Sequence, residues 1–342
     1  MSTGAAVGSQ SLDCNSAQQK QRSSVKTVEG NHLAKSQPSE VLDNCPSGRV
    51  TLRSDTNPTL SKNKLLNLIL SELSNATDER VLEYKSSMLE QLTGLLRSSI
   101  VVQRTHHIAI RIFSHCHQTT RLGYDSLLQN LRVIIMSTAL HDSHVPWFEN
   151  SLDQMLVAGF LTIQEKASLE RYHGTIPIED VDSNSLAFKS FGPPYQASRK
   201  EPDYAVKPIG SRLPTLVFES GWSESRPQLY HDRDLWLRGG QGFVQVILII
   251  KWTANANKRV KGDIEVFDLD IDGNPRLLQH EIIFPAPDLA LALSQHITVT
   301  RHQLFGPNQP AGQNRAQFTH LSLNDLRVIA ARNMGNDGYT PA

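Results

Sequence analysis

Five consecutive apolar residues, Val246 to Ile250, constrain the fold of this chain more than any other short segment. Side chains alternate between the two faces of a β-strand, so a strand with one solvated face alternates apolar and polar residues. An unbroken apolar run is typical of a strand that is covered on both faces. The segment VQVILIIKW therefore predicts a central strand of a mixed α/β sheet with helices on either side.

Segments on both sides of this run have the two-residue apolar period of further strands. From about residue 175 onward these segments are LAFKSF, DYAVKP, PTLVFES and GDIEVFDLDIDGN, and the last ends in a hairpin turn. One helix interrupts them, because Ser225 and Gln228 form a capping-box pattern at the start of SRPQLYHDRDLWLRGG. The segment SLNDLRVIAARNM predicts a second, capped helix near the C-terminus.

The N-terminal part of the chain has a different pattern. Residues 1–60 are rich in Ser, Asn, Gln and Lys and poor in aromatics, so we expect a disordered tail. From residue 61 to about 172 apolar residues recur at three- and four-residue spacing, which predicts helices. The expected organisation is a tail at 1–60, an α-helical region at 61–149 and a mixed-sheet domain at 150–335 with a C-terminal extension. The fold class is α+β, with a mixed α/β sheet.

The composition excludes several classes of protein. The 342 residues carry 34 basic and 34 acidic side chains, so net charge gives no general argument for a nucleic-acid partner. No run of about 18 apolar residues is present, so we expect no membrane-spanning helix, and the first residues lack the apolar core of a secretory signal. Three cysteines at spacings that match no metal template indicate reduced thiols, and hence an intracellular protein, cytoplasmic or nuclear.

Two carboxylates lie on neighbouring strand segments. Asp203 follows Pro202 at the start of DYAVKP, and Glu219 lies near the end of PTLVFES. If these strands pair, the two carboxylates meet near one edge of the sheet, where they repel each other unless a cation intervenes. Mg²⁺ suits such a site because it binds through one or two carboxylates and keeps several waters. A metal there can bind a phosphate oxygen and acidify a water for in-line attack.

The same residues carry a resemblance to a known family. A Pro-Asp pair, a glutamate sixteen positions later on a hydrophobic strand, a helix and an all-apolar strand resemble the PD-(D/E)XK restriction-endonuclease-like superfamily. The segment ESGWSES, followed by a Leu-Trp-Leu helix, is also similar to fungal proteins of unknown function. The resemblance covers roughly residues 150 to 275. It implies an αβββαβ core with Asp203 and Glu219 as metal ligands.

The sequence departs from the superfamily at the motif lysine. The family pattern has this lysine two residues after the glutamate, where this chain has Gly221. In bacterial relatives the lysine lies on the next helix, at positions that match Asp232 and Arg233 here. Arg233 can offset phosphate charge but stays protonated and cannot act as a base. Lys251 at the end of the central strand is the other main candidate, and Lys207 is a third; a lysine stabilises the attacking hydroxide or the developing charge.

Simpler explanations for these residues stay open. Asp203 can begin a strand through a turn-type hydrogen bond, and Glu219 can form a structural salt bridge with Arg233 or Lys251. The histidine-rich segment RTHHIAIRIFSHCHQ matches no standard zinc spacing.

Two hypotheses of function follow. In the first, the protein is a Mg²⁺-dependent endonuclease that hydrolyses DNA phosphodiesters with Asp203 and Glu219, assisted by Lys251 or Arg233. In the second, the nuclease-like core is degenerate and the protein is a non-catalytic interaction protein. Its helical region then binds a partner or a second copy, which gives a homo-oligomer.

Overall fold

The computed structural model covers the mixed-sheet part of the chain most fully. The tail at 1–60 and residues 61–79 and 86–119 of the expected helical region, which include the histidine-rich segment, lie outside the described residues, so those expectations stay predictions. The residues that the structure describes are 80–85, 120–128, 130–135, 138–173, 188–222, 224–309 and 312–342.

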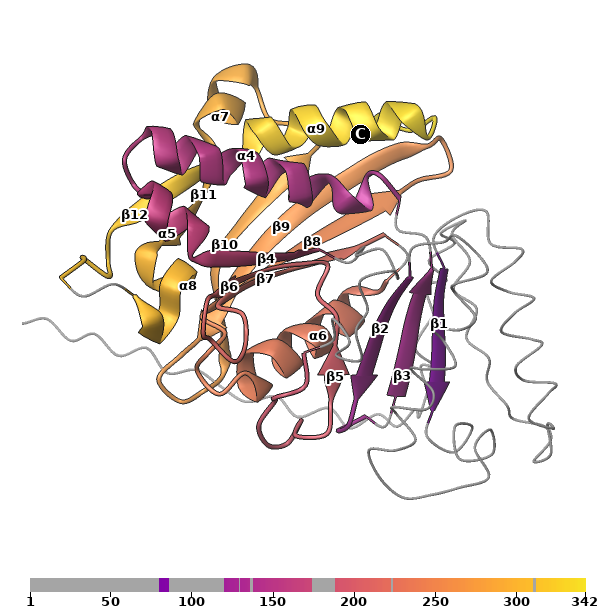
Figure 1. Cartoon of the computed structure of the whole chain (residues 1–342). Coiled ribbons are helices and arrows are strands. Elements are labelled where there is room, and N and C mark those ends of the chain that lie inside the picture. The colour runs from indigo at the N-terminus through magenta and orange to yellow at the C-terminus, as the bar shows by residue number, and fades with distance from the viewer. Residues whose placement is uncertain are drawn as a thin grey trace, which may run out of the picture. The chain divides into compact units, whose positions relative to one another are not determined.

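A seven-stranded mixed sheet, here called the main sheet, forms the centre of the fold (Figure 1). Strands β7 and β8 run parallel, whereas the other neighbours along its main path are antiparallel. The short β13 (Thr340–Pro341) pairs in parallel with β9. In spatial order the main path is β10 (Pro275–Phe284), β9 (Arg259–Leu269), β8 (Val246–Ala254), β7 (Leu216–Gly221), β6 (Tyr204–Pro208) and β4 (Leu169–His173).

Strand β8 is covered on both faces, as its apolar run predicts. Leu248 and Ile250 belong to the hydrophobic core on one face of the main sheet. Ile247 and Ile249 belong to the core on the other face. All five residues of the run are fully buried. The expectation of a central strand in a mixed sheet is therefore confirmed.

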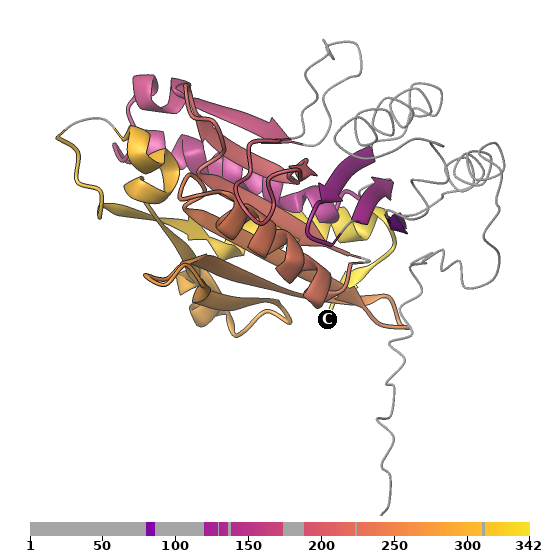
Figure 2. The same cartoon turned by 90° about the horizontal axis from the view of Figure 1, so that it is seen from below.

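Helices cover the two faces of the main sheet. Helices α4 (His144–Val157) and α9 (Leu323–Asn336) lie on one face, and α6 (Arg226–Gly239) lies on the other (Figures 1 and 2). Trp147 of α4 packs in the first core and Trp236 of α6 in the second. The remaining elements are η1 (His141–Ser143), α5 (Ile163–Ala167), α7 (Leu289–Ser294), α8 (Arg301–Phe305), η3 (Gly306–Asn308) and the pair β11 (His296–Thr300) and β12 (Phe318–Ser322).

The predicted helices α6 and α9 are present. The hydroxyl of Ser322 accepts a hydrogen bond from the backbone N–H of Asp325 and so caps α9. Ser225 is the N-cap residue of α6, but its side chain makes no capping hydrogen bond. The capping-box pattern thus predicts the start of this helix correctly and its capping contact wrongly. Among the described residues, no helix is long and apolar enough to cross a membrane.

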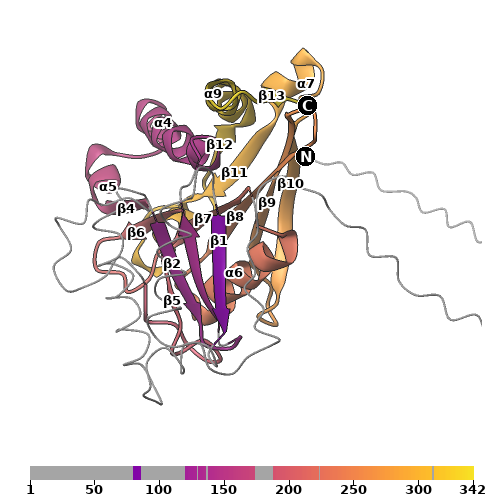
Figure 3. The same ribbon diagram turned by 90° about the vertical axis from the view of Figure 1, so that its right-hand side faces the viewer.

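A second, four-stranded antiparallel sheet, here called the small sheet, stands beside the main sheet (Figure 3). Its spatial order is β1 (Arg80–Lys85), β3 (Asn130–Ile135), β2 (Thr120–Asp125) and β5 (Arg199–Lys200). The expectation of helices is therefore wrong for 80–85, 120–125 and 130–135, which are strands. The physical reason lies in a turn: the Asp125 carboxylate accepts hydrogen bonds from the backbone N–H groups of Leu127 and Leu128, which favours a hairpin. A short apolar run such as LRVII fits a strand as well as a helix.

The segment 151–173, at the end of the region where we expect helices, is helical only in part. Helix α4 ends at Val157, and Gly159 adopts a positive φ of 70°, a left-handed conformation that stops the helix. Thr162 and Glu165 then form a capping box that begins α5. Leu169 starts strand β4. The coarse α+β class with a mixed sheet is confirmed.

Candidate functional site

Asp203 and Glu219 lie at the same end of two paired strands. In the antiparallel register of β6 and β7, Tyr204 pairs with Phe218, and these two residues are the chain neighbours of Asp203 and Glu219. The Asp203 carboxylate also accepts a hydrogen bond of 2.5 Å from the backbone N–H of Ser220. The strand pairing expected from the sequence therefore brings the two carboxylates to the same end of β6 and β7. Both side chains are buried there, each 2% exposed.

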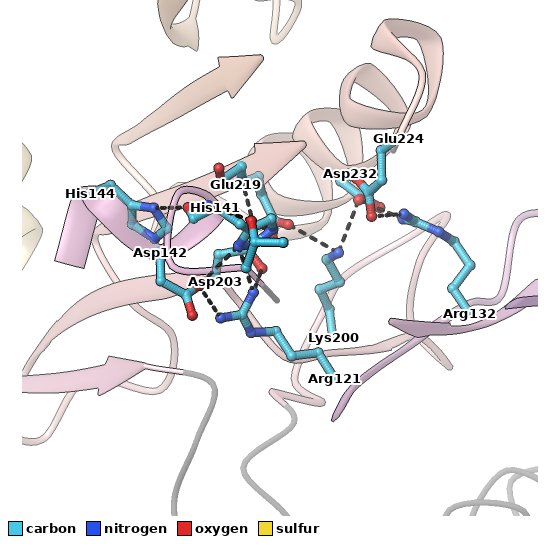
Figure 4. Close-up of polar contacts among 12 residues, drawn as sticks. Arg121, Arg132, His141, Asp142, His144, Lys200, Asp203, Glu219, Glu224 and Asp232 are labelled. Atoms are coloured by element: carbon cyan, nitrogen blue, oxygen red, sulfur yellow. Dashed lines mark hydrogen bonds and ion pairs between the residues drawn. The ribbon is translucent and has the colours of Figure 1, made fainter. Parts of the chain in front are cut away.

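Asp203 is held by a guanidinium group from the small sheet. Nη1 of Arg121, on β2, lies 2.6 Å from Oδ1 of Asp203, and Nη2 of Arg121 lies 2.7 Å from Oδ1 of Asp142 (Figure 4). His141 lies 2.9 Å from Asp142 and 3.5 Å from Asp203. Burial opposes ionisation of Asp203, but Arg121 and His141 outweigh it and lower the pKa of this carboxyl.

Glu219 contacts a helix on one side and the small sheet on the other. The indole N–H of Trp236, on α6, donates a hydrogen bond of 2.6 Å to Oε1 of Glu219. Nζ of Lys200, on β5, lies 3.1 Å from Oε2. Burial raises the pKa of Glu219 to about 8, with Lys200 acting to lower it and the carboxylates of Asp203 and Asp232 acting to raise it. Glu219 therefore keeps its proton to a higher pH than an exposed glutamate does.

Lys200 begins a chain of ion pairs that extends away from Glu219. Its Nζ lies 2.9 Å from Oδ2 of Asp232, on α6, and Nη1 of Arg132 lies 2.7 Å from the same oxygen. Arg132 also forms an ion pair with Glu224 just before α6. Burial acts to lower the pKa of Lys200, but Asp232 and Glu219 raise it above its ordinary value. Lys200 therefore stays charged.

These contacts define a buried charge cluster of seven side chains, each at most 7% exposed. All three basic members come from the small sheet, whereas the four carboxyl groups lie outside its strands. The carboxyl groups outnumber the basic side chains by one. Two of these carboxyl groups, Asp203 and Asp232, contribute to the raised pKa of Glu219. The members are Arg121, Arg132, Lys200, Asp203, Glu219, Glu224 and Asp232.

The basic residues that the sequence indicated make other contacts. Nζ of Lys251 donates hydrogen bonds to the backbone oxygens of Trp222 and Trp252 at 2.8 and 2.7 Å. Arg233 pairs with its neighbour Asp234 and lies over the ring of Tyr230 at 4.6 Å.

Lys207 pairs with Glu170 at 2.5 Å, on the neighbouring strand β4. The buried ion pair of Glu219 is thus made with Lys200. The catalytic roles of Lys251 and Arg233 stay predictions.

Sequence reasoning missed the three basic residues and the two histidines near Asp203. Lys200 had a weak signal, since it precedes Asp203 by three residues in SRKEPD. Arg121 is 82 residues away from Asp203 in the chain, and the wrong helix prediction for its region concealed it. His144 stacks on Phe218 with ring centroids 5.5 Å apart, and burial lowers its pKa to about 4. This histidine is therefore neutral at physiological pH.

The donor atoms of this site fit a hard divalent cation. Asp203 and Glu219 offer carboxylate oxygens, the ligands that Mg²⁺ prefers, and the excess of carboxyl groups favours added positive charge. Both carboxylates already bind a basic side chain, so a cation has to displace or join Arg121 and Lys200.

A separate group of ligating side chains lies on β9 and β10. Among the described residues, Asp263, Glu265 and His280 form the one set of three whose ligand atoms lie within 4.8 Å of one another. The guanidinium of Arg226 occupies this set, because it pairs with Asp263 at 2.7 Å and with Glu265 at 2.6 Å. Tyr230 donates a further hydrogen bond to Glu265. These carboxylates therefore have their counter-charge within the chain.

The elements around the site form a mixed sheet with helices on both faces. Helix α4 is followed in the main layers by β4, β6, β7, α6 and β8, and β7 is parallel to β8. No protein-family model, curated protein or solved structure matches the chain. Element order is shared by unrelated proteins, so membership of the PD-(D/E)XK superfamily stays a proposal.

Proposed function

We propose that this protein is a metal-dependent nuclease-like protein of the PD-(D/E)XK type that hydrolyses phosphodiester bonds of DNA. Asp203 and Glu219 are the metal ligands in this proposal, and Mg²⁺ is the cation that their oxygen donors favour. The observation that carries the proposal is the convergence of these two carboxylates at one end of β6 and β7, with the ammonium group of Lys200 3.1 Å from Glu219.

Lys200 takes the role of the motif lysine in this proposal. The superfamily pattern needs an ammonium group beside the glutamate, and Gly221 cannot supply it. Lys200 reaches Glu219 from β5, and Gly123 on β2 permits this path: a Cβ at position 123 would lie 3.2 Å from Cδ of Lys200. Asp232 holds the ammonium group in place and keeps it protonated. A fixed positive charge of this kind stabilises negative charge that develops on a phosphate.

The reaction adds water across a phosphorus–oxygen bond. The hydroxyl of the water bonds to phosphorus, the bond to the leaving oxygen breaks, and that oxygen takes a proton. A bound divalent cation supplies Lewis acidity and lowers the pKa of a water molecule. In the chain itself, Asp203 and Glu219 would hold the cation, and the ammonium group of Lys200 would offset the negative charge of the phosphate.

Nicking of supercoiled plasmid DNA by the purified full chain tests the proposal. We expect cleavage in Mg²⁺ or Mn²⁺ that chelator abolishes and that Asp203→Asn, Glu219→Gln and Lys200→Met each remove. Lys166→Met is the matched control, because this lysine pairs with Asp153 on a different part of the surface. Cleavage that persists in all three site variants comes from a contaminant and contradicts the proposal.

Two further measurements make this experiment decisive. Thermal unfolding of each variant separates loss of chemistry from loss of fold. Lys251→Met separates the two lysines: retention of cleavage in this variant, with loss in Lys200→Met, assigns the basic role to Lys200. The reverse result assigns it to Lys251.

A second function is favoured by a different observation. Every carboxyl group of the buried charge cluster already contacts a basic side chain or an indole N–H, and each is at most 7% exposed. Such a network also serves as a scaffold in a non-catalytic interaction protein. Absence of Mg²⁺ and Mn²⁺ binding by calorimetry, together with a stable homo-oligomer in solution, supports this function.

A further inference from the structure

One guanidinium group bridges two carboxylates at the centre of the site. The two terminal nitrogens of Arg121 lie 2.6 Å from Asp203 and 2.7 Å from Asp142. The Arg121 side chain is 5% exposed and that of Asp203 is 2% exposed, so their contact is shielded from water, whereas the side chain of Asp142 is 34% exposed. A planar guanidinium has the geometry to contact two oxygens at once. A divalent cation between two carboxylates makes the same kind of bridge.

The basic and the acidic members of the buried charge cluster belong to different parts of the fold. Arg121, Arg132 and Lys200 are carried by β2, β3 and β5 of the small sheet. Glu219 lies on β7 of the main sheet, and Asp232 lies on α6, which covers that sheet (Figure 4). The small sheet therefore presents its positive charges to the acidic end of the main sheet. The ion pairs between them are made by buried side chains.

We infer that the guanidinium group of Arg121 occupies the cation position beside Asp203, so that the small sheet and a divalent cation compete for this proposed metal ligand. The inference rests on the proposed metal site and adds its regulation. With Arg121 in place, the carboxylates are neutralised from within the chain. A cation that binds there displaces Arg121 and loosens the small sheet. The small sheet and the metal ion then bind to the same carboxylate in alternation.

The inference distinguishes Arg121 from Arg132. Both provide one buried positive charge from the small sheet, but Arg121 pairs with Asp203 and Asp142, whereas Arg132 pairs with Glu224 and Asp232. Loss of Arg121 therefore vacates the cation position itself, whereas loss of Arg132 only makes the surroundings more negative. Competition predicts a larger gain in metal affinity for the first variant than for the second.

Calorimetric titration of the full chain with Mn²⁺ alone is the experiment. We expect Arg121→Gln to bind Mn²⁺ at least tenfold more tightly than the unmodified chain, and Arg132→Gln to change the dissociation constant by less than threefold. Hydrogen exchange supplies a second readout: Mn²⁺ should speed exchange of the β2 amides, residues 120–125, in the unmodified chain. The Arg121→Gln variant should also gain more thermal stability from Mn²⁺ than the unmodified chain gains.

The outcomes separate this inference from the proposed function. If Mn²⁺ binds the unmodified chain, is lost in Asp203→Asn, and binds Arg121→Gln with unchanged affinity, the metal site stands and the competition is refuted. Equal tightening in Arg121→Gln and Arg132→Gln also refutes it, because it reports general electrostatics. If no variant binds Mn²⁺, both the metal site and the competition are wrong. A variant that fails to fold is replaced by Arg121→Lys, which keeps the charge but has a shorter side chain with one terminal nitrogen in place of two, and should bind Mn²⁺ more tightly than the unmodified chain.

Discussion

The ammonium group of Lys200 lies 3.1 Å from the carboxylate of Glu219, although the two residues belong to different sheets. The contact joins β5 of the small sheet to β7 of the main sheet in a region where both side chains are at most 5% exposed. A buried charge without a partner is costly, so each of these residues makes the other tolerable in the interior. Their interdependence leads to the first prediction.

Lys200→Met should destabilise the protein by about 3–5 kcal/mol, the typical cost of removing one partner from a buried pair. The change leaves Asp232 with Arg132 alone and leaves Glu219 without an ammonium partner. Urea unfolding at neutral pH measures the loss. Lys166→Met, which removes a more exposed pair with Asp153, should cost less than about 1 kcal/mol. Equal losses in the two variants contradict the structural role of Lys200.

Glu219→Gln should remove a pH dependence of stability. The pKa of Glu219 is about 8 in the folded protein against an ordinary value of 4.5, so the folded state binds the extra proton between these values. In the unmodified chain this group therefore makes stability fall as pH rises from about 5 to 8, with a slope approaching about 1.4 kcal/mol per pH unit. Urea unfolding across this range, without divalent cations, should show the slope in the unmodified chain and its loss in Glu219→Gln.

His144 should make the protein sensitive to acid. Burial lowers its pKa to about 4 against an ordinary value of 6.5, with Asp203 and Asp142 acting in the opposite direction. The unfolded chain binds the His144 proton at a higher pH than the folded protein does. The contribution of this group to the free energy of unfolding is therefore fully present above about pH 6.5 and is lost as pH drops toward 4, by about 3 kcal/mol in all. His144→Phe keeps a ring against Phe218 and should flatten this part of the profile. An unchanged acid limb in the variant assigns acid sensitivity to other groups.

Trp236→Phe should cost more than Trp252→Phe. Both indoles are fully buried, but Nε1 of Trp236 donates a hydrogen bond to Glu219, whereas Nε1 of Trp252 has no hydrogen-bond partner among the described residues. The two changes remove the same atoms, so the difference isolates the hydrogen bond to the protonated carboxyl group of Glu219, worth about 0.5–1.5 kcal/mol. Thermal unfolding of the pair measures it. A larger loss for Trp252→Phe shows that packing outweighs the bond.

The main sheet could be predicted from the sequence because local periodicity fixes it. The apolar run in β8 and the alternation in β6 and β7 each specify which faces are buried, and the structure has those strands. The convergence of Asp203 and Glu219 follows from the same alternation. These features need no information from distant parts of the chain.

The small sheet and the basic half of the site could not be predicted in this way. Strands β1 to β3 carry short apolar segments whose spacing fits a helix equally well, so tertiary pairing decides their structure. Arg121 and Arg132 reach the carboxyl groups across 82 to 100 residues of sequence, and no periodicity records such a contact. The lysines that the sequence indicated, Lys207 and Lys251, lie on β6 and β8, whereas Lys200 lies on the short strand β5.

Only three residues separate β5 from β6, and they include Asp203 itself. Three residues extend to roughly 10 Å at most, and Pro202 restricts the backbone freedom of this connection further. The connection between the two sheets contains the proposed metal ligand Asp203. Any movement of the small sheet away from the main sheet, and so from the site, therefore also displaces the backbone of Asp203.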